Sequence, residues 1–315
     1  MEIGGYLGLE AFESKPYYPN LYALNLARTA LTYLLEALNA KTIFVPYYLC
    51  DSVAISCRKK GFEVLLYYLN DDLSPCFNDE LPEDSYLLLV NYYGQLSDDK
   101  IIAFKEKYER VIVDNTQSFF QKPIADIPTF YSCRKFFGVS DGAYLYSNVE
   151  MPPLDEQDKS GERMTHILGR FEGNATDYYQ AMLDTANSYA NAEVKKMSRL
   201  TANILGAIDY ESVRAKRNEN YRILDSFLGE YNTLPFIAPD GPLAYPFFHP
   251  NTPVIRKKLA AQGIYVPTYW TNVIDEMFED TIEYQYASNI LVLPVDQRYG
   301  KDQMQIVADT ILHLP

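Results

Sequence analysis

Short apolar segments rich in β-branched and aromatic residues alternate with segments of helical spacing between residues 20 and 150. This alternation is typical of βαβ units, whose strands lie parallel in one sheet. The apolar segments are nearly continuous, as expected where helices cover both faces of a sheet. Strands are predicted at 42–46, 63–69, 86–91, 110–114, 129–132 and 142–146, and helices at 27–38, 51–60 and 98–108. In the last helix, Ile101, Phe104 and Tyr108 share one stripe opposite Glu106, which predicts packing on a sheet face.

A polar, proline-containing segment at 151–163 predicts a loop, and helical spacing follows at 177–205 and 210–231. Further along, apolar runs at 242–248, 264–270 and 290–294 alternate with helical patterns at 251–262 and 301–312. A chain of 315 residues more often forms two domains than one. The sequence therefore predicts an α/β large domain over 1–205 with a mostly parallel sheet. A smaller C-terminal α+β domain is predicted over 206–315.

Charge and composition argue against several classes of function. The chain has 28 basic and 42 acidic side chains without a basic run, so binding to nucleic acid or to anionic membranes is not expected. No apolar run approaches the ~20 residues of a membrane span, and the start lacks the features of a signal peptide, so a cytoplasmic location is expected. No metal site is expected, because the cysteines and histidines are scattered: Cys50, Cys57, Cys76, Cys133, His166, His249 and His313.

Polar residues follow the predicted strands directly, where open parallel sheets present their ligand sites. Asp114 closes one predicted strand and Gln117 follows it three residues later, Tyr93 follows another strand, and Ser132 closes a third, shortly before Lys135. A carboxylate and a lysine at one sheet edge suit pyridoxal phosphate, which needs a lysine for a Schiff base and an acid beside its pyridine nitrogen. Taken singly, such an Asp is more often a turn or cap residue and such a Lys a solvated one.

A phosphate could bind to a helix that begins near Asn25, with Arg28 beside its free amides. The alternative for this segment is an Asn-capped helix with a surface arginine. No GxGxxG or GxxxxGK motif follows a strand, so nucleotide hydrolysis and NAD chemistry lack their usual phosphate loops.

In their order along the chain, these segments resemble the DegT/DnrJ/StrS family of pyridoxal-phosphate-dependent, fold-type-I sugar aminotransferases. Tyr93-Gly94-Gln95, the Asp114–Gln117 motif and Lys135 carry the most specific likeness. The matching stretches span most of the chain: LARTAL at 26–31, FVPYYLCDSV at 44–53, NYYGQLSDD at 91–99, VIVDNTQSFF at 111–120, YSCRKFFGVSDGAYL at 131–145, the helical piece at 198–224 and ILVLPVDQRYGKDQMQIVADTI at 290–311.

The resemblance implies a three-layer αβα cofactor domain and transfer of an amino group from an amino acid to a nucleotide-linked keto sugar, within sugar biosynthesis. It implies that Lys135 forms the Schiff base, that Asp114 pairs with the pyridine nitrogen, and that Gln117 lies near the phenolic oxygen. Ser132 and the segment Ala27, Arg28 and Thr29 would bind the phosphate. The remaining expected cofactor contacts are Tyr48, Cys50 and Tyr93.

Some positions depart from the family pattern. Only Cys133 and Arg134 separate Ser132 from Lys135, where four residues are usual, and in an extended chain Arg134 would point away from Lys135. Cys50 stands where an aromatic residue usually covers the pyridine ring. These departures motivate the alternative of a degenerate fold-type-I protein with a binding or regulatory role. A dehydratase is disfavoured, because family members with that chemistry have histidine in place of the lysine.

The resemblance also implies a homodimer with shared active sites. Aromatic pairs at 119–120, 136–137 and 47–48 are the candidate interface material, although such pairs are more often core. The acceptor substrate and the amino donor are not identified by the sequence. Arg134, Arg199 and Arg298 are candidates, in no order, for the anchor of the donor carboxylate.

Overall fold

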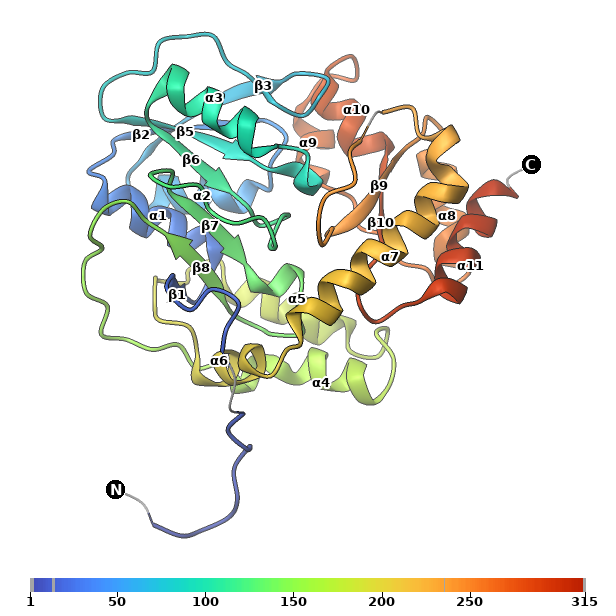
Figure 1. The fold of residues 1–315 in the computed structure, drawn as a ribbon, viewed down its shortest axis with the longest axis horizontal. Coiled ribbons are helices and arrows are strands. Elements are labelled where there is room, and N and C mark those ends of the chain that lie inside the picture. Colours follow the sequence, from blue (N-terminus) through green and yellow to red (C-terminus); the bar gives the residue numbers. More distant parts are fainter. Residues whose placement is uncertain (1–2, 13–14, 235, 314–315) are drawn as a thin grey trace.

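A large sheet forms the centre of the molecule in the computed structural model, which describes residues 3–12, 15–234 and 236–313 (Figure 1). Its strand order is β1-β8-β7-β6-β5-β2-β3-β4, and the five strands from β3 to β7 in that order pair parallel. The short edge strands β1 and β4 and the strand β8 pair antiparallel. The strands are β1 Tyr22–Leu24, β2 Thr42–Pro46, β3 Glu63–Leu69, β4 Pro75–Cys76, β5 Ser85–Val90, β6 Val111–Asp114, β7 Thr129–Ser132 and β8 Ala143–Tyr146. The predicted α/β class with a mostly parallel sheet is confirmed.

Helices cover both faces of this sheet (Figure 1). The first three helices are α1 Ala27–Ala37, α2 Asp51–Lys59 and α3 Asp98–Tyr108. In α3, Ile101 and Tyr108 are buried and Glu106 is exposed, as the stripe predicted. The Ser97 hydroxyl accepts from the Lys100 amide at the start of α3, and acidic residues in the first turn favour the same end. Both local capping and the buried stripe therefore fix this helix.

The predicted helix at 177–205 is wrong, because the chain forms two helices there with an extended segment between them. The helices after the sheet are α4 Thr165–Glu172, α5 Tyr179–Ser188 and α6 Arg199–Gly206. Between α5 and α6 the backbone runs beside β1: the Asn25 amide donates to the Lys195 carbonyl, and the Met197 amide donates to Ala23. Ser198 then caps α6, and buried Asp141 accepts from its amide and its hydroxyl. These tertiary contacts override the helical spacing of the segment.

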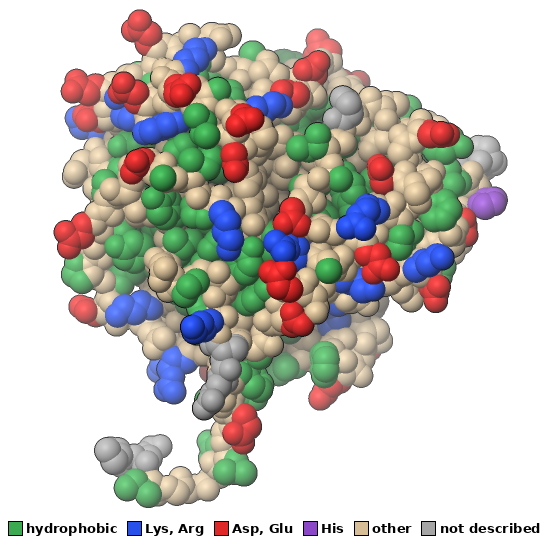
Figure 2. All heavy atoms as spheres, in the orientation of Figure 1, with side chains coloured by type: hydrophobic (Ala, Val, Ile, Leu, Met, Phe, Trp, Pro, Cys, Tyr) green, Lys and Arg blue, Asp and Glu red, His purple; other side chains and the backbone are tan. Residues whose placement is uncertain are grey.

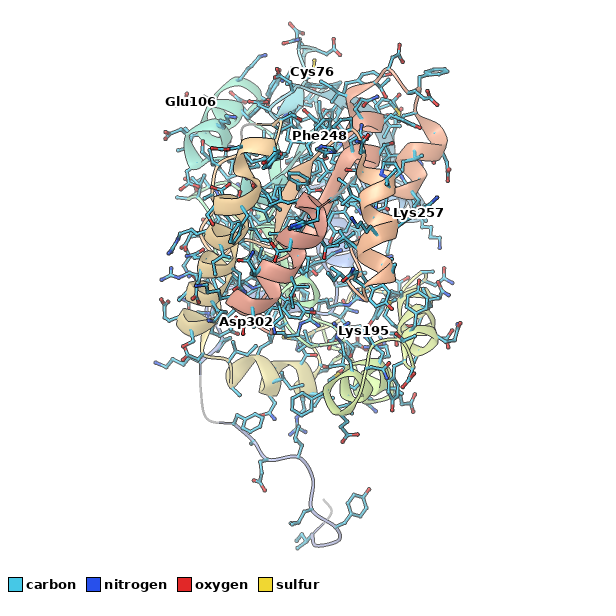
Figure 3. All side chains as sticks on the ribbon, turned by 90° about the vertical axis from the view of Figure 1, so that its right-hand side faces the viewer. Cys76, Glu106, Lys195, Phe248, Lys257 and Asp302 are labelled. Carbon is cyan, nitrogen blue, oxygen red and sulfur yellow. The ribbon has the colours of Figure 1, made fainter. Side chains whose placement is uncertain are left out.

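A second hydrophobic cluster lies beside the large sheet. It joins side chains of the antiparallel ribbon of β9 and β10 to side chains of α7, α8 and α11, and these three helices lie side by side in Figure 3. The elements are α7 Tyr210–Leu228, β9 Ala244–Phe248, α8 Thr252–Ala261, α9 Thr271–Glu276, α10 Ile282–Asn289, β10 Ile290–Pro294 and α11 Lys301–Leu312. The apolar run at 264–270 forms no strand, and instead leads into α9.

The paired phenylalanines proposed as interface material lie inside the molecule. Phe119, Phe120, Phe136 and Phe137 are at most 6% exposed and belong to the main core cluster, and Tyr48 is fully buried. Only Tyr47 of these aromatic residues is half-buried. The structure therefore assigns the phenylalanine pairs to the core, and their use as evidence for an interface was wrong.

Basic and acidic side chains are interspersed over the face of the molecule shown in Figure 2.

Within the described parts of the chain, no helix has the length and apolar character needed to cross a membrane.

Candidate active site

A cavity of about 320 Å³ lies at the carboxyl edge of the sheet. Its wall comes from the N-terminus of α1 and from the segments that follow β2, β6 and β7. This is the edge at which open parallel sheets bind ligands. Seven of the ten predicted cofactor contacts line it: Ala27, Arg28, Cys50, Asp114, Gln117, Ser132 and Lys135.

Asp114 is the last residue of β6, and its side chain is 3% exposed. Burial raises the pKa of its carboxyl group to about 6, although hydrogen bonds from Thr116 and the charge of Lys135 oppose this shift. The Thr116 amide donates to Asp114 Oδ1 over 2.8 Å, which fixes the carboxylate at the cavity wall. A bound group that carries a proton on nitrogen would favour the ionised form.

Gln117 lines the cavity three residues after Asp114. Its Oε1 accepts from the Tyr93 amide over 3.0 Å, so its amide nitrogen is the end left to donate to a ligand. Tyr93 itself is fully buried and lies behind the wall, with its hydroxyl 3.3 Å from that of Tyr48. The structure thus places Tyr48 and Tyr93 as support for the wall and not in it.

Positive groups gather at the N-terminus of α1. Among the described residues, the amides of Ala27, Arg28 and Thr29 have no hydrogen-bond acceptor, since the first helical bond runs from Ala30 to Leu26. Arg28 and Arg134 both line the cavity, and no ion pair within the described residues involves either. The guanidinium carbon of Arg134 lies 4.3 Å from the centre of the Tyr189 ring. Free helix amides with two cations make a site for a doubly charged anion.

The Thr29 side chain does not reach the cavity, because its hydroxyl donates to Asn25 Oδ1 over 2.8 Å. Only its amide belongs to the anion-binding end of α1. Of the other candidate arginines, Arg298 pairs with Asp296 and Arg199 is exposed at the start of α6, so only Arg134 lines the cavity.

Lys135 reaches the cavity in spite of the short interval after Ser132. Residues Cys133–Lys135 form a 3-10 turn and not an extended strand, so Arg134 and Lys135 both line the wall. The extended chain on which the expected direction of Arg134 depended is therefore wrong. Lys135 is exposed at the cavity mouth, and its Nζ lies 5.0 Å from the centre of the Tyr269 ring.

Trp270 lines the cavity and was missed by the sequence reasoning. Its ring centre lies 5.1 Å from that of Tyr48 and 5.1 Å from that of Tyr269, with which it is stacked. It supplies an aromatic wall near Cys50, the position at which the family pattern has an aromatic residue and this chain does not. The one signal in the sequence was that Trp270 is the only tryptophan in the chain.

Within the described residues, no group of three or more His, Cys, Asp or Glu side chains could hold a metal ion.

No family model matches the sequence, and no curated protein matches it. The fold, by contrast, has clear neighbours among solved structures. A DegT DnrJ EryC1 StrS aminotransferase from Brucella abortus matches with a TM-score of 0.63 at 14% identity, covering 93% of this chain and 85% of its own. The sugar aminotransferase CalS13 from Micromonospora echinospora matches with a TM-score of 0.62 at 12% identity, covering 93% and 87%. NtdA from Bacillus subtilis, with bound cofactor PMP, matches with a TM-score of 0.64 at 16% identity, covering 93% of this chain and 72% of its own.

These neighbours establish the fold of the chain as that of the DegT-type aminotransferases. The fold class expected from the motifs is thereby confirmed over nearly the whole chain.

Asp114→Asn should stabilise the ligand-free protein at pH 8. The folded carboxyl, with its pKa of about 6, binds a proton more readily than the unfolded one at 3.8. The ionised group therefore destabilises the fold above pH 6, by up to ~3 kcal/mol at ~1.4 kcal/mol per pH unit, and this penalty fades as the pH falls toward 4. Urea unfolding between pH 5 and pH 8 measures the difference.

Asp209→Asn is a control of opposite sign. Hydrogen bonds from Ser212 lower the pKa of Asp209, and its negative charge lies at the positive N-terminal end of α7. The ionised form therefore favours the fold, and the variant, which caps without the charge, should lose stability at pH 8. Equal stabilities of wild type and Asp114→Asn at pH 8 would contradict the placement of an ionised carboxylate in a buried position.

Pyridoxal phosphate should quench the tryptophan fluorescence of the protein. Trp270 is the sole tryptophan and lines the cavity, so any quenching reports on that site. Trp270→Phe should bind the same ligand by equilibrium dialysis while losing the signal. If saturating ligand leaves the wild-type emission unchanged, Trp270 does not contact the bound group.

Proposed function

We propose that the protein is a pyridoxal-phosphate-dependent aminotransferase. The observation that carries the proposal is a single cavity that contains a buried carboxylate, a primary amine and an anion-binding helix end. Asp114, Lys135 and the α1 amides supply these groups, and they come from three separate segments of the chain. The fold shared with aminotransferases, including one solved with PMP, supports the same proposal.

The residues present fit the cofactor chemically. When bound, pyridoxal phosphate supplies an electron sink that stabilises negative charge on the carbon next to nitrogen. Asp114 would accept a hydrogen bond from the pyridinium nitrogen, and the Gln117 amide would donate to the phenolic oxygen. The phosphate would be held by Ser132, Arg28, Arg134 and the amides of Ala27, Arg28 and Thr29.

Lys135 has two roles in this proposal. As a primary amine it can bond to an aldehyde carbon, which the neighbouring guanidinium of Arg134 cannot do. Released from that bond, its Nζ can accept a proton at one carbon and deliver it to another as a general base and acid. Tyr269 and Trp270 flank this part of the wall and would limit the access of water to the proton in transfer.

For the substrates we propose an amino acid as donor and a nucleotide-linked keto sugar as acceptor. This rests on the neighbours, since CalS13 is described as a sugar aminotransferase. The competing idea of a protein with a degenerate cofactor site rested on the short interval before Lys135 and on Cys50. The 3-10 turn at 133–135 and the presence of Trp270 remove the reason for it.

Lys135 is predicted to be the residue that pyridoxal phosphate modifies. The protein is incubated with the cofactor and reduced with borohydride, and the labelled peptide is mapped by mass spectrometry. We expect the label on Lys135 and none on Lys122, whose amine lies 3.5 Å from the centre of the Tyr17 ring. Lys135→Ala should abolish the label and the visible absorbance. A label on another lysine in the wild type would overturn the assignment.

We propose a homodimer whose interface adjoins the cavity. The supporting surface is the α2–β3 patch, which we define as Ile55, Leu66, Tyr68 and Tyr47. Ile55, Leu66 and Tyr68 are 40–49% exposed, and Tyr47 packs against Tyr68 with ring centres 4.7 Å apart. A hollow of about 200 Å³ in this patch is lined also by Leu49 and Cys50, which belong to the cavity wall. Exposed apolar residues in contact with each other favour a partner surface.

Leu66→Glu should convert the dimer to a monomer, because a charge in an apolar interface loses its hydration without a partner. Light scattering at micromolar concentration measures the mass, for which a monomer has 36.2 kDa. Ile306→Glu, at a residue 52% exposed on α11, is the matched control and should leave the mass unchanged. A wild-type protein that is already monomeric and still binds the cofactor would refute the shared interface.

We further propose the division into a cofactor domain over 1–205 and a small domain over 206–315. The second hydrophobic cluster supports it, because its residues all lie between 221 and 311. A cytoplasmic location is proposed as well, since the buried thiols of Cys57 and Cys133 are free and a reducing compartment keeps them so.

A further inference from the structure

Arg217 of α7 has the largest side chain among the fully buried residues that the structure describes, and it is 1% exposed. Burial lowers the pKa of its guanidinium to about 10, and Asp296 opposes this shift. That carboxylate is already bound by Arg298, over 2.7 and 2.9 Å. A buried cation without a bonded carboxylate costs several kcal/mol of desolvation, so its presence needs a specific explanation.

The guanidinium is satisfied by neutral acceptors from three segments. Nε donates to Gln297 Oε1 over 2.9 Å, Nη1 donates to the carbonyls of Pro242 and Leu243, and Nη2 donates to the Phe136 carbonyl over 3.0 Å. Its central carbon also lies 4.7 Å from the centre of the Phe136 ring. Arg217 thus joins α7 and the ribbon domain to the residue next to Lys135.

The Phe136 carbonyl accepts a second donor from the same network, because Gln297 Nε2 reaches it over 2.9 Å. Phe136 also ends the 3-10 turn that carries Lys135, and its amide donates to the Cys133 carbonyl over 3.0 Å. The turn is therefore fixed on both sides of Phe136: the Phe136 amide bonds within the turn, and the Phe136 carbonyl is held by Arg217 and Gln297 from the other domain.

We propose that Arg217 and Gln297 are positioning residues that set the direction of the Lys135 side chain through the Phe136 carbonyl. The proposal rests on the proposed function of Lys135. Lys135 is exposed and has a long, flexible side chain, so the turn at its base is what limits where its amine lies. A small displacement of a reacting group can cost a large factor in rate. The network also makes the placement of Lys135 depend on α7 and on the loop after β10.

A purely structural role is the competing explanation, and Asn220 provides the control for it. Asn220 lies one helical turn after Arg217 and is fully buried. Its side-chain nitrogen donates to the carbonyls of Val295, Asp296 and Tyr299, in the same loop as Gln297. It holds that loop to α7 without touching Phe136. Asn220→Leu should therefore lower stability as Gln297→Leu does, while leaving the lysine turn intact.

The test measures the reactivity of the Lys135 amine in the ligand-free protein. Wild type, Gln297→Leu, Arg217→Lys and Asn220→Leu are treated with limiting acetic anhydride between pH 7 and pH 10, under conditions where urea curves show each to be folded. Mass spectrometry gives the labelling of Lys135 relative to Lys257, which is exposed on α8 and labelled in Figure 3. The rate of pyridoxal phosphate capture, trapped by borohydride, is measured in parallel.

We expect Gln297→Leu to change the Lys135-to-Lys257 labelling ratio by about threefold or more and to slow cofactor capture about tenfold. Arg217→Lys should do the same, because one ammonium nitrogen cannot take the place of three donor nitrogens spread over a planar guanidinium. Asn220→Leu should change neither quantity. The proposal is overturned if Gln297→Leu labels like the wild type, or if Asn220→Leu shifts the ratio equally. If the ratio responds as expected but the wild-type protein itself captures no cofactor, the positioning role stands and the proposed function fails.

Discussion

An ionised carboxylate at the end of a buried strand is the constraint around which the cavity is built. Asp114 ends β6 in the middle of the sheet, where apolar strands lie on both sides and water is largely excluded. The Thr116 amide and the charge of Lys135 offset part of the cost of ionisation, but the pKa of Asp114 stays raised. At neutral pH this cost of ionisation is relieved by a ligand that brings its own proton-bearing nitrogen, and so the unliganded site is the less stable one.

The strands and the residues directly after them could be predicted from the sequence, because local pattern determines both. The segments at 42–46, 63–69 and 129–132 are continuous apolar runs with polar ends, and they form strands with those limits. Asp114 and Ser132 are the last residues of such strands, and Gln117 lies three residues after one. In a parallel sheet the carboxyl ends share an edge, so their convergence required no knowledge of distant contacts.

Other features could not be predicted, because they depend on segments far apart in the chain. Trp270 reaches a wall whose other members lie between residues 26 and 135, and no local pattern marks it. The break in the helix predicted at 177–205 is made by Asn25 and Asp141, both distant in sequence, which bind the backbone and cap of that segment. The turn at 133–135 is likewise held by Arg217 and Gln297. Each case is a tertiary contact that prevails over local preference.

The late position of Trp270 has a consequence for the newly made chain. The residues of the anion-binding end of α1 and of the lysine turn have all been synthesised once Phe136 is in the chain, but Trp270 follows about 134 residues later, roughly 7–27 s at ~5–20 residues/s. The contacts that seat its segment also span the chain, as Asn272 donates to the Leu49 carbonyl and Glu283 accepts from the Leu69 amide. Every nascent molecule therefore passes through a stage in which the cavity lacks one wall. Phosphorylated aldehydes in the surrounding solution can reach Lys135 during that interval, before the ribosome has finished the protein.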